Sequence, residues 1–397
     1  MKKICLFVVG LYIGMFAGFA QNNNDSSSYK KHTLTFEEAN MVSSYYKQDG
    51  NNSAVTGGIG TEKLNDISNT FDLKMYKYDR SLRKHTLNME MGIDHYTSAS
   101  SDMVDLKANS SASHADTRFY PSINWTMENE NKGTTVGAGA SFSHEFDYQS
   151  IGANLNFAKK TKDKSGELSA KIQAYFDQVK LVYPTELRAN PNGRENNYAS
   201  TPRNSFSGSL SWSQIVNQRL QMSIDGDVVY QKGYLSLPFH RVYFNDNTVH
   251  IETLPSTRLK IPIGLRANYF LGDKVILRAF YRYYTDNWGL HAHTASLEVP
   301  FKVTPFISIS PFYRYYIQTA VNYFEAYKQH TAADQYYTSN HDLSAFSSNF
   351  YGAGIRLTPP KGVLGIQRLN MLEIRYGHYT KNIGMQSDII SFNLKFK

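Results

Sequence analysis

Seven arginines in the C-terminal half of the chain have a spacing that could serve a chemical purpose. Together with Lys260, they lie on the polar side of segments whose alternate residues are apolar: Arg258, Arg266, Arg278, Arg282, Arg314, Arg356 and Arg375. Fixed guanidinium groups along a narrow aqueous passage would raise the local concentration of anions. Four carboxylates at comparable positions could instead pair with them and brace a wall: Asp225, Asp227, Glu298 and Glu373. We favour the pairing and keep the basic passage as the functional alternative.

A second cluster combines aromatic and basic residues between positions 233 and 257. Its candidate ligand-binding residues surround Pro238, which stiffens the run: Tyr234, Phe239, His240, Arg241 and Tyr243. A loop of this composition on a rigid scaffold is suited to capturing a ligand. It could equally fold inward and only occlude an opening, with the aromatic stretch 323–337 as its partner. The sequence leaves both interpretations open.

The histidines do not suggest a catalytic or metal centre. His291 and His293 would project to one side of a strand, as two ligands of one metal must, but no third ligand is evident nearby. His144 and the pair His378 and Asp388 lack the local signature of a nucleophile with its base. We therefore predict no catalytic residue, no metal site, no cofactor and no enzymatic activity.

The segment 258–284 shows what kind of element carries these residues. Apolar side chains recur at every second position from Leu259 to Tyr269, and the positions between them are mostly polar or charged. The pattern stops at the turn 271–274 and restarts at Val275. Strict alternation of this kind predicts two β-strands joined as a hairpin. Strands of about ten residues at a tilt of about 40° match the hydrocarbon thickness of a bilayer.

The same alternation recurs along the chain and predicts an all-β fold, a transmembrane antiparallel β-barrel of about 16 strands, with about 14 as the alternative. We expect strands near residues 54–62, 70–79, 85–97, 117–127, 134–146, 149–158, 167–177, 205–215, 219–231, 259–269, 275–285, 291–301, 306–318, 350–358, 371–380 and 388–396. Bacterial barrels have short periplasmic turns and long extracellular loops. With the C-terminus in the periplasm, the longest connections become extracellular: 98–116, 178–204, 232–258 and 319–349. Only the connection 359–370 is longer than expected for a turn on the periplasmic side.

The N-terminus predicts export. Residues 1–20 combine a basic start, an apolar core and small residues before Gln21, as in a secretory signal peptide. Cys5, the only cysteine, lies within it, so the mature chain would contain neither a thiol nor a disulfide. We expect residues 21–52 to form a periplasmic or plug segment with a short helix at 34–46, and residues 53–397 to form the barrel.

Charge and aromatic residues fit a barrel in the cell outer membrane. The formal charge of +8 is scattered along alternating strands and not gathered on one patch, so we expect no nucleic-acid partner. Aromatic residues on the apolar register, Tyr148 among them, are expected to form a girdle in contact with outer-membrane lipid. The last segment, 388–396, is amphipathic and has Phe396 near its end, a pattern that the barrel-assembly machinery would recognise.

Two stretches of the chain resemble a known family. Residues 45–64 read YYKQDGNNSAVTGGIGTEKL, and residues 233–244 read GYLSLPFHRVYF. Both resemble an uncharacterised outer-membrane family of Gram-negative bacteria, domain of unknown function 3570. The resemblance implies a surface barrel of unassigned substrate, in a family often encoded near flavin-transferase and thioredoxin-like lipoprotein genes. It therefore also implies an envelope lipoprotein as a partner in redox chemistry or export.

These observations lead to two main expectations of function. The first is an outer-membrane channel or a transport or export component, whose polar, net-basic lumen is gated by long loops. The second is a closed barrel that serves as a surface-binding or assembly platform for an envelope lipoprotein or redox system. A membrane-embedded hydrolase that uses His144 or His378 is the third hypothesis and ranks last.

Overall fold

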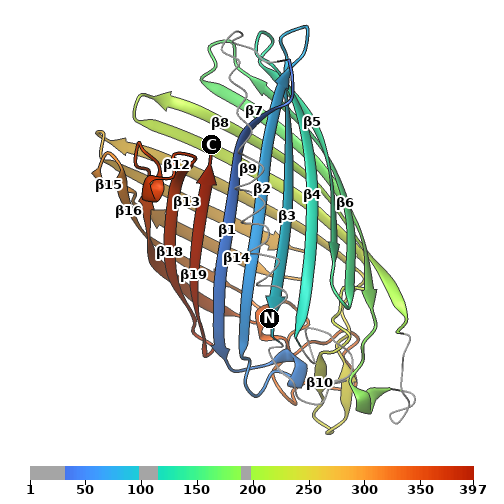
Figure 1. Ribbon diagram of the computed structural model, residues 1–397. Coiled ribbons are helices and arrows are strands. Elements are labelled where there is room, and N and C mark those ends of the chain that lie inside the picture. The colour runs from blue at the N-terminus through green and yellow to red at the C-terminus, as the bar shows by residue number, and fades with distance from the viewer. Residues whose placement is uncertain (1–31, 98–114, 189–197) are drawn as a thin grey trace.

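One β-sheet curls until its last strand meets its first (Figure 1). The computed structural model describes residues 32–97, 115–188 and 198–397. Neighbouring strands pair antiparallel, and the pairing of β19 (Met385–Phe396) with β1 (Thr35–Gly50) closes the sheet. No helix in the described parts of the chain is long and apolar enough to cross a membrane. The prediction of an all-β antiparallel barrel is confirmed.

The barrel strands between β1 and β19 are long, with the exception of β14 and β15. They run from 11 residues in β5 to 18 residues in β8. Their bounds are β2 (Leu64–Tyr78), β3 (Lys84–Tyr96), β4 (Asp116–Asn129), β5 (Thr134–His144), β6 (Tyr148–Lys160), β7 (Gly166–Lys180), β8 (Ser200–Asn217), β9 (Leu220–Gly233), β12 (Thr257–Leu271), β13 (Val275–Asp286), β14 (His291–Glu298), β15 (Phe301–Thr304), β16 (Ile307–Gln318), β17 (Phe346–Leu357) and β18 (Leu369–Lys381). A separate hairpin consists of β10 (Arg241–Tyr243) and β11 (Val249–Ile251).

The sheet has 17 strands, but β14 and β15 share one place between β13 and β16. Val299 and Pro300 separate the two strands. Pro300 has no N–H to donate to the ladder, which fits the interruption of the strand here. The wall of the barrel therefore has sixteen strand positions, which agrees with the predicted number of about 16 and not with 14.

The start of the barrel differs from the prediction. The helix expected at 34–46 is wrong, because these residues belong to β1, which pairs with β19 on one side and β2 on the other. The strand expected at 54–62 is also wrong. That stretch holds a short 3-10 helix, Ala54–Thr56, and glycines 57, 58 and 60 with φ of 82°, 83° and 79°, a region that strands do not use. The barrel therefore begins at Thr35 and not at residue 53, and the two errors cancel in the strand count.

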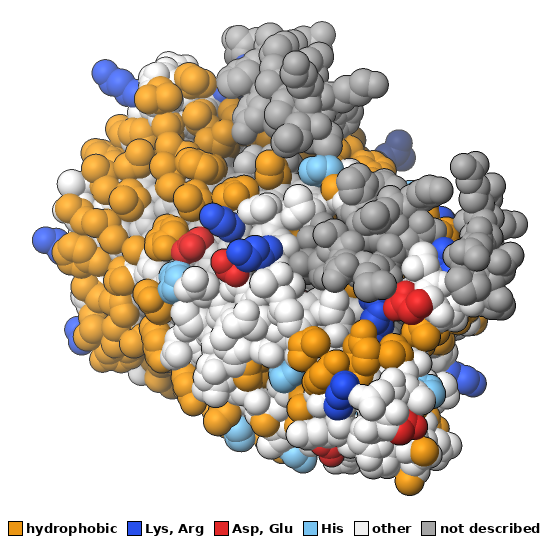
Figure 2. Space-filling model, turned by 90° about the horizontal axis from the view of Figure 1, so that it is seen from below, with side chains coloured by type: hydrophobic (Ala, Val, Ile, Leu, Met, Phe, Trp, Pro, Cys, Tyr) orange, Lys and Arg blue, Asp and Glu red, His pale blue; other side chains and the backbone are white. Residues whose placement is uncertain are grey.

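Side chains alternate between the two faces of the wall. On β6, Ile151 and Leu155 are 55% and 56% exposed on the outer face, while Asn154 lines a cavity on the inner face. Figure 2 shows such hydrophobic side chains covering a flank of the molecule. Tyr148 was expected on the apolar face, and this is wrong. Its hydroxyl donates to Asp177 on the inner face, because the outward residues of β6 are the odd-numbered ones.

Long and short connections lie at opposite ends of the barrel. The segments 51–63, 234–256 and 319–345 connect strands at the end that carries the β10–β11 hairpin (Figure 1). The other end holds turns such as 272–274 and the C-terminal Lys397. The longest connection there, 358–368, packs Val363 against the barrel residues Ala39, Leu369 and Phe396. Residues 1–20, the predicted signal peptide, lie outside the described residues.

The strand assignment of β1 can be tested with single cysteines at positions 40–46, one at a time, because the mature chain should contain no other thiol. Nitroxide labels on a strand should alternate with period two between exposure to lipid-soluble oxygen and to a water-soluble relaxation agent. Position 43 should report lipid and position 44 should report water. A period near 3.6 would instead show that these residues form the helix expected from the sequence.

Candidate functional site

A roof of loops covers the long-loop end of the barrel. We use this name for the segments 51–63, 181–188, 234–256 and 319–345. They contact one another through single β-bridges, such as those of Phe244 with His330 and of Thr253 with Tyr337. Because these loops leave the barrel from strands on different sides, their contacts span the opening. Figure 2 shows this end of the molecule from outside.

Arg241 joins three of these loops. Its Nε donates to Oε1 of Glu186 at 2.5 Å, and its Nη1 donates to the backbone oxygen of Val55 at 2.7 Å. Its side chain is only 2% exposed. Hydrogen bonds to a buried guanidinium are stronger than neutral ones, and without Arg241 the carbonyl of the buried Val55 would lose this donor, whereas Glu186 is exposed and can bind water. The three loops are therefore held at one charged side chain.

A buried carboxylate organises the centre of the roof. Glu252 accepts hydrogen bonds from the backbone N–H of Leu237 at 2.7 Å and from the Thr338 hydroxyl at 2.5 Å, and His240 lies 3.4 Å away. Burial raises the pKa of the Glu252 carboxyl, but the charge of His240 and these donors outweigh burial and hold the pKa below its ordinary value. The carboxylate thus stays ionised while it ties the loops 234–256 and 319–345 together.

An apolar cluster seats the roof in the mouth of the barrel. Leu254 of the roof packs with Trp288 and Ala292. Tyr284 and Tyr316, which lie on the inner faces of β13 and β16, pack against the same cluster. The loop 233–257 therefore folds into the opening on this side of the barrel.

The predicted ligand-binding residues of this loop are largely engaged in the roof itself. His240 and Arg241 are buried, Phe239 packs on Val55, and the Tyr243 ring stacks near Tyr327 with centroids 5.0 Å apart. The backbone oxygen of Tyr234 accepts from Arg203. The structure brings these residues together, and capture of a ligand by them stays a prediction.

Carboxylates approach six of the seven predicted lumen arginines. The shortest distances within each pair are Arg258–Asp286 2.5 Å, Arg266–Asp225 3.9 Å, Arg278–Glu298 3.8 Å, Arg282–Asp227 3.8 Å, Arg356–Glu373 2.7 Å and Arg375–Glu373 3.1 Å. Arg375 also contacts Glu298 at 3.1 Å. Asp286 was not among the predicted carboxylates. The structure thus contains arginine–carboxylate pairs, the arrangement that we favoured from the sequence.

The seventh arginine stacks on an aromatic ring. The guanidinium of Arg314 lies 4.9 Å from the centroid of Phe350, and that of Arg375 lies 5.0 Å from the centroid of Phe312. A cation above a ring face is attracted by about 0.5–1 kcal/mol or more. These contacts fix the positions of the guanidinium groups. We call this inner surface of β9 and β12–β18 the arginine wall.

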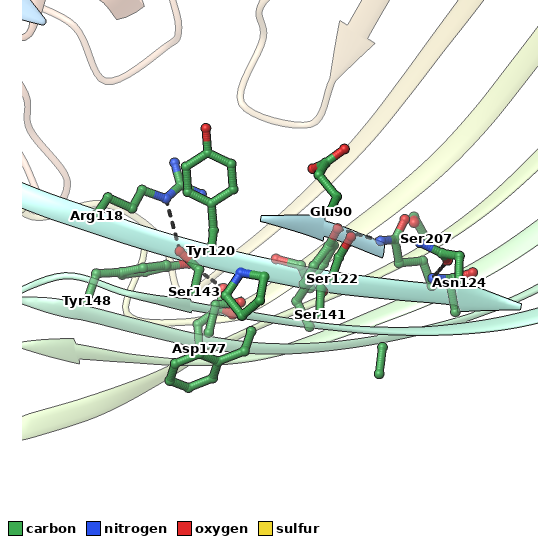
Figure 3. A pocket seen from close by; sticks show the side chains of 18 of the residues that line it. Glu90, Arg118, Tyr120, Ser122, Asn124, Ser141, Ser143, Tyr148, Asp177 and Ser207 are labelled. Carbon is green, nitrogen blue, oxygen red and sulfur yellow. Dashed lines mark hydrogen bonds between the residues drawn. The ribbon is translucent and has the colours of Figure 1, made fainter. Parts of the chain in front are cut away.

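A cavity of about 570 Å³ lies on the opposite inner surface, formed by β3–β9 (Figure 3). Hydroxyl, amide and tyrosine side chains dominate its lining: Tyr120, Ser122, Asn124, Ser141, Ser143, Tyr148, Ser150, Asn154, Gln173, Tyr175, Ser205 and Ser207. We call this surface the hydroxyl wall. The interior of the barrel therefore has two chemically different sides.

The sequence analysis missed the hydroxyl wall, although β8 carries a signal for it. Serine occupies every second position from Ser205 to Ser213, and the residues Phe206, Leu210 and Trp212 between them are exposed on the outer face. This alternation predicts a serine stripe on the inner face of a barrel. The sites expected from the sequence were chosen by charge and aromatic content, and this stripe has neither.

The histidines considered above as metal or catalytic residues lie on the outer face and near its rim. The His291 and His293 rings contact the hydroxyls of Tyr283 and Tyr281 at 3.0 and 2.7 Å. His378 and Asp388 are hydrogen bonded at 2.8 Å. Asp388 also accepts a hydrogen bond from the Tyr376 hydroxyl at 2.7 Å, so the pair is part of a polar network with a tyrosine on the outer wall.

Three carboxylates meet at the long-loop end. Ligand oxygens of Asp116, Glu145 and Asp147 lie within 4.8 Å of one another. The Tyr96 hydroxyl donates to Glu145, and the backbone N–H of Phe146 donates to Asp116. Burial, and then the charges of Glu145 and Asp116, raise the pKa of Asp147 to about 7. Protonation of Asp147 would relieve the repulsion among the three carboxylates, and we assign no metal to them.

Asp147→Asn should stabilise the protein more at pH 8 than at pH 5. Because the carboxyl of the unfolded chain ionises above its ordinary pKa of 3.8, keeping the proton in the folded protein already costs some stability at pH 5, and the full cost is reached above pH 7. We expect an increase in the free energy of unfolding on the order of 1–3 kcal/mol at pH 8 and about a third of that at pH 5. Thermal unfolding in detergent measures both values. Asp273→Asn in an exposed turn is the control, and an equal effect at the two pH values would contradict the assignment.

Glu373→Gln should weaken the arginine wall. Glu373 is 6% exposed and pairs with Arg356 and Arg375, so the substitution removes the charge between two guanidinium groups. Loss of such charged hydrogen bonds should lower the free energy of unfolding by about 1–3 kcal/mol. Urea titration in detergent measures this. Glu90→Gln, an inner-face glutamate with no close ion pair among the described residues, should change stability by less than about 0.5 kcal/mol. Equal stability of the two variants would refute the bracing role.

Several solved structures are similar to this chain at low sequence identity. A mutant ferric enterobactin receptor (PfeA) from Pseudomonas aeruginosa shares 10% identity with a TM-score of 0.46, over 87% of this chain and 53% of the receptor. This chain thus spans about half of that receptor. OccK1 (OpdK) from Pseudomonas aeruginosa shares 8% identity with a TM-score of 0.43, over 92% and 99% of the two chains. A BenF-like porin from Pseudomonas fluorescens Pf-5 shares 9% identity with a TM-score of 0.44, over 92% and 99%.

A family model supplies the sequence relationship. No curated protein matches this chain in sequence. The model described as protein of unknown function (DUF3570) matches residues 94–384. This range includes the stretch 233–244 that carried the resemblance, whereas the stretch 45–64 precedes it. The chain belongs to the DUF3570 family of proteins of unknown function.

Proposed function

We propose that this chain is an outer-membrane β-barrel that acts as a channel or as a transport or export component, gated by its long loops. The outer face supports the membrane setting. Apolar side chains on several strands are 47–60% exposed there, including Leu155, Ile172, Ile224 and Ile263. An apolar band of this extent is stable in contact with hydrocarbon and not with water.

The inner face supports a polar lumen of slightly basic character. The seven arginines of the arginine wall meet five carboxylates, so that positive charge is in excess there. The hydroxyl wall adds small polar side chains, which leave space that a larger residue would fill. Barrels of about 16 strands are wide enough for an aqueous path. We therefore expect weak anion preference and not strict anion selectivity.

The observation that carries the proposal is the roof and its attachment through Arg241. Loops that meet over the opening restrict passage, and loops joined mainly at a few buried polar side chains, such as Arg241 and Glu252, can separate without unfolding the barrel. The structure thus supports a closed state from which an open state is reached by loop movement. The proposed location also requires cleavage of residues 1–20, assembly by the barrel-assembly machinery and contact with outer-membrane lipid.

A closed barrel that serves as a binding or assembly platform is the alternative. The buried Glu252 centre and the apolar cluster around Trp288 give the roof a core of its own, which favours a permanently folded surface. An envelope lipoprotein of a redox or export system would be its partner. Cross-linking in cells should then recover one specific lipoprotein with the barrel.

Arg241→Ala tests whether the roof acts as a gate of the channel. The substitution removes the hydrogen bonds to Glu186 and Val55, each of which joins two loops. Charged hydrogen bonds contribute about 1.5–3 kcal/mol, and each 1.4 kcal/mol is tenfold in an equilibrium. We expect the open probability in planar lipid bilayers to rise at least about tenfold. Arg241→Lys, which keeps the charge but not the planar fork, should give an intermediate value.

The control is Arg80→Ala in an exposed turn at the opposite end of the barrel, which should conduct like the unmodified protein. Heat-dependent mobility on gels must show that every variant folds. If folded unmodified protein and folded Arg241→Ala both fail to conduct, the channel proposal is wrong and the platform remains.

A further inference from the structure

The cavity on the hydroxyl wall has balanced charge. Its ionisable side chains are two carboxylates, Glu90 and Asp177, and two cations, Arg118 and Lys171. Two of the four are already engaged within the wall. The Arg118 Nε donates to the Ser143 hydroxyl at 2.9 Å, and Asp177 accepts from a tyrosine hydroxyl (Figure 3). The site therefore offers no net charge to a ligand.

The remaining polar groups can both donate and accept hydrogen bonds. Serine hydroxyls such as Ser205 and Ser207 do so with one atom, and the amides of Asn124, Asn154 and Gln173 do so with two. A ligand that matches this surface must carry many groups that also donate and accept. Hydroxyl groups on a neutral scaffold have that property, while phosphates and carboxylates only accept.

Tyr175 provides a flat apolar surface among these polar groups. It pairs directly with Gly152 on the neighbouring strand, and a Cβ atom at Gly152 would lie 2.6 Å from Cε1 of the ring. The ring therefore covers the glycine and lies along the wall. Gln173 hydrogen bonds to its hydroxyl. The opposite face of the ring has no aromatic or cationic contact among the described residues.

Tyr120 differs in this respect. Its ring covers Gly92 in the same way, but Arg118 lies 5.0 Å above its centroid and occupies the other face. Of these two rings, only Tyr175 can accept a ligand by stacking. One free ring face beside a field of hydroxyls and amides suits a pyranose ring, which has an apolar C–H face and a rim of hydroxyls.

We infer that the cavity on the hydroxyl wall binds a segment of a neutral oligosaccharide, with one sugar ring stacked on Tyr175. The cavity volume of about 570 Å³ lies within the range of small-molecule sites. The inference rests on the proposed function, because it names the substrate class of the channel. An anionic solute would favour the arginine wall instead. An apolar solute would leave the hydroxyls and amides without partners.

Calorimetric titration of the full-length protein tests the inference. The detergent must be free of sugar, such as an amine oxide, because a maltoside would compete. The probes are three neutral oligosaccharides, maltoheptaose, cellohexaose and chitohexaose, with hexagalacturonate as the anionic comparison. Each is measured on the unmodified protein and on Arg241→Ala, so that a closed roof cannot hide the site. At least one neutral probe should bind, and at least tenfold more tightly than hexagalacturonate.

Variants locate the binding within the cavity. Tyr175→Ala should weaken binding about tenfold or more, and Tyr175→Phe should retain it, because the ring face and not the hydroxyl carries the stacking. Ser207→Leu should block binding by filling the cavity, whereas Ser391→Leu on β19, beside the arginine wall, is the matched control and should bind normally. Each variant must show the heat-dependent gel mobility of a folded barrel.

Three results would overturn the inference. These are no binding of any neutral probe to either protein, equal or tighter binding of hexagalacturonate, and binding that is insensitive to both Tyr175→Ala and Ser207→Leu. The conductance experiment is separate. Conductance without saccharide binding would refute this inference alone, and saccharide binding without conductance would refute the channel alone.

Discussion

A residue in a closed antiparallel barrel can point only outward or inward, and most features of this structure follow from that constraint. Charged side chains of the strands gather inside, where directly opposed pairs such as Arg278 with Glu298 and Arg356 with Glu373 form across neighbouring strands. Tyrosines cover glycines across the same ladders, as Tyr175 covers Gly152. The composition of the two inner walls therefore follows directly from the strand registers.

Local alternation was enough to predict most of the barrel from the sequence, because each strand has an apolar face. It failed for β1, where Phe36, Ala39 and Met41 have spacings that fit a helix as well as a strand. Pairing with β2 on one side and with β19, far away in the sequence, on the other decides between them. Tyr148 was misplaced for a related reason, since a strand end gives too few residues to fix the register.

The polar contacts of the roof could not be predicted, because they join residues that are distant in sequence and follow no period. Arg241 contacts Glu186 and Val55 through geometry that exists only once the barrel has placed three loops around one opening. Composition identified the loop 233–257 as a candidate and left inward folding against 323–337 as one of two interpretations, but it could not supply these contacts. The serine stripe of β8 is different, because its signal is local and was available. Charged residues alone give no indication of a surface that consists of hydroxyls and amides.

The contact between β1 and β19 has a consequence for how the protein is made. β1 is synthesised before every other strand of the barrel, yet one of its edges stays unpaired until β19, the last strand, has been made. During that interval an unpaired edge is open to wrong partners, including other copies of the same chain. A carrier that shields extended segments in transit would therefore matter more for this seam than for any hairpin elsewhere in the wall.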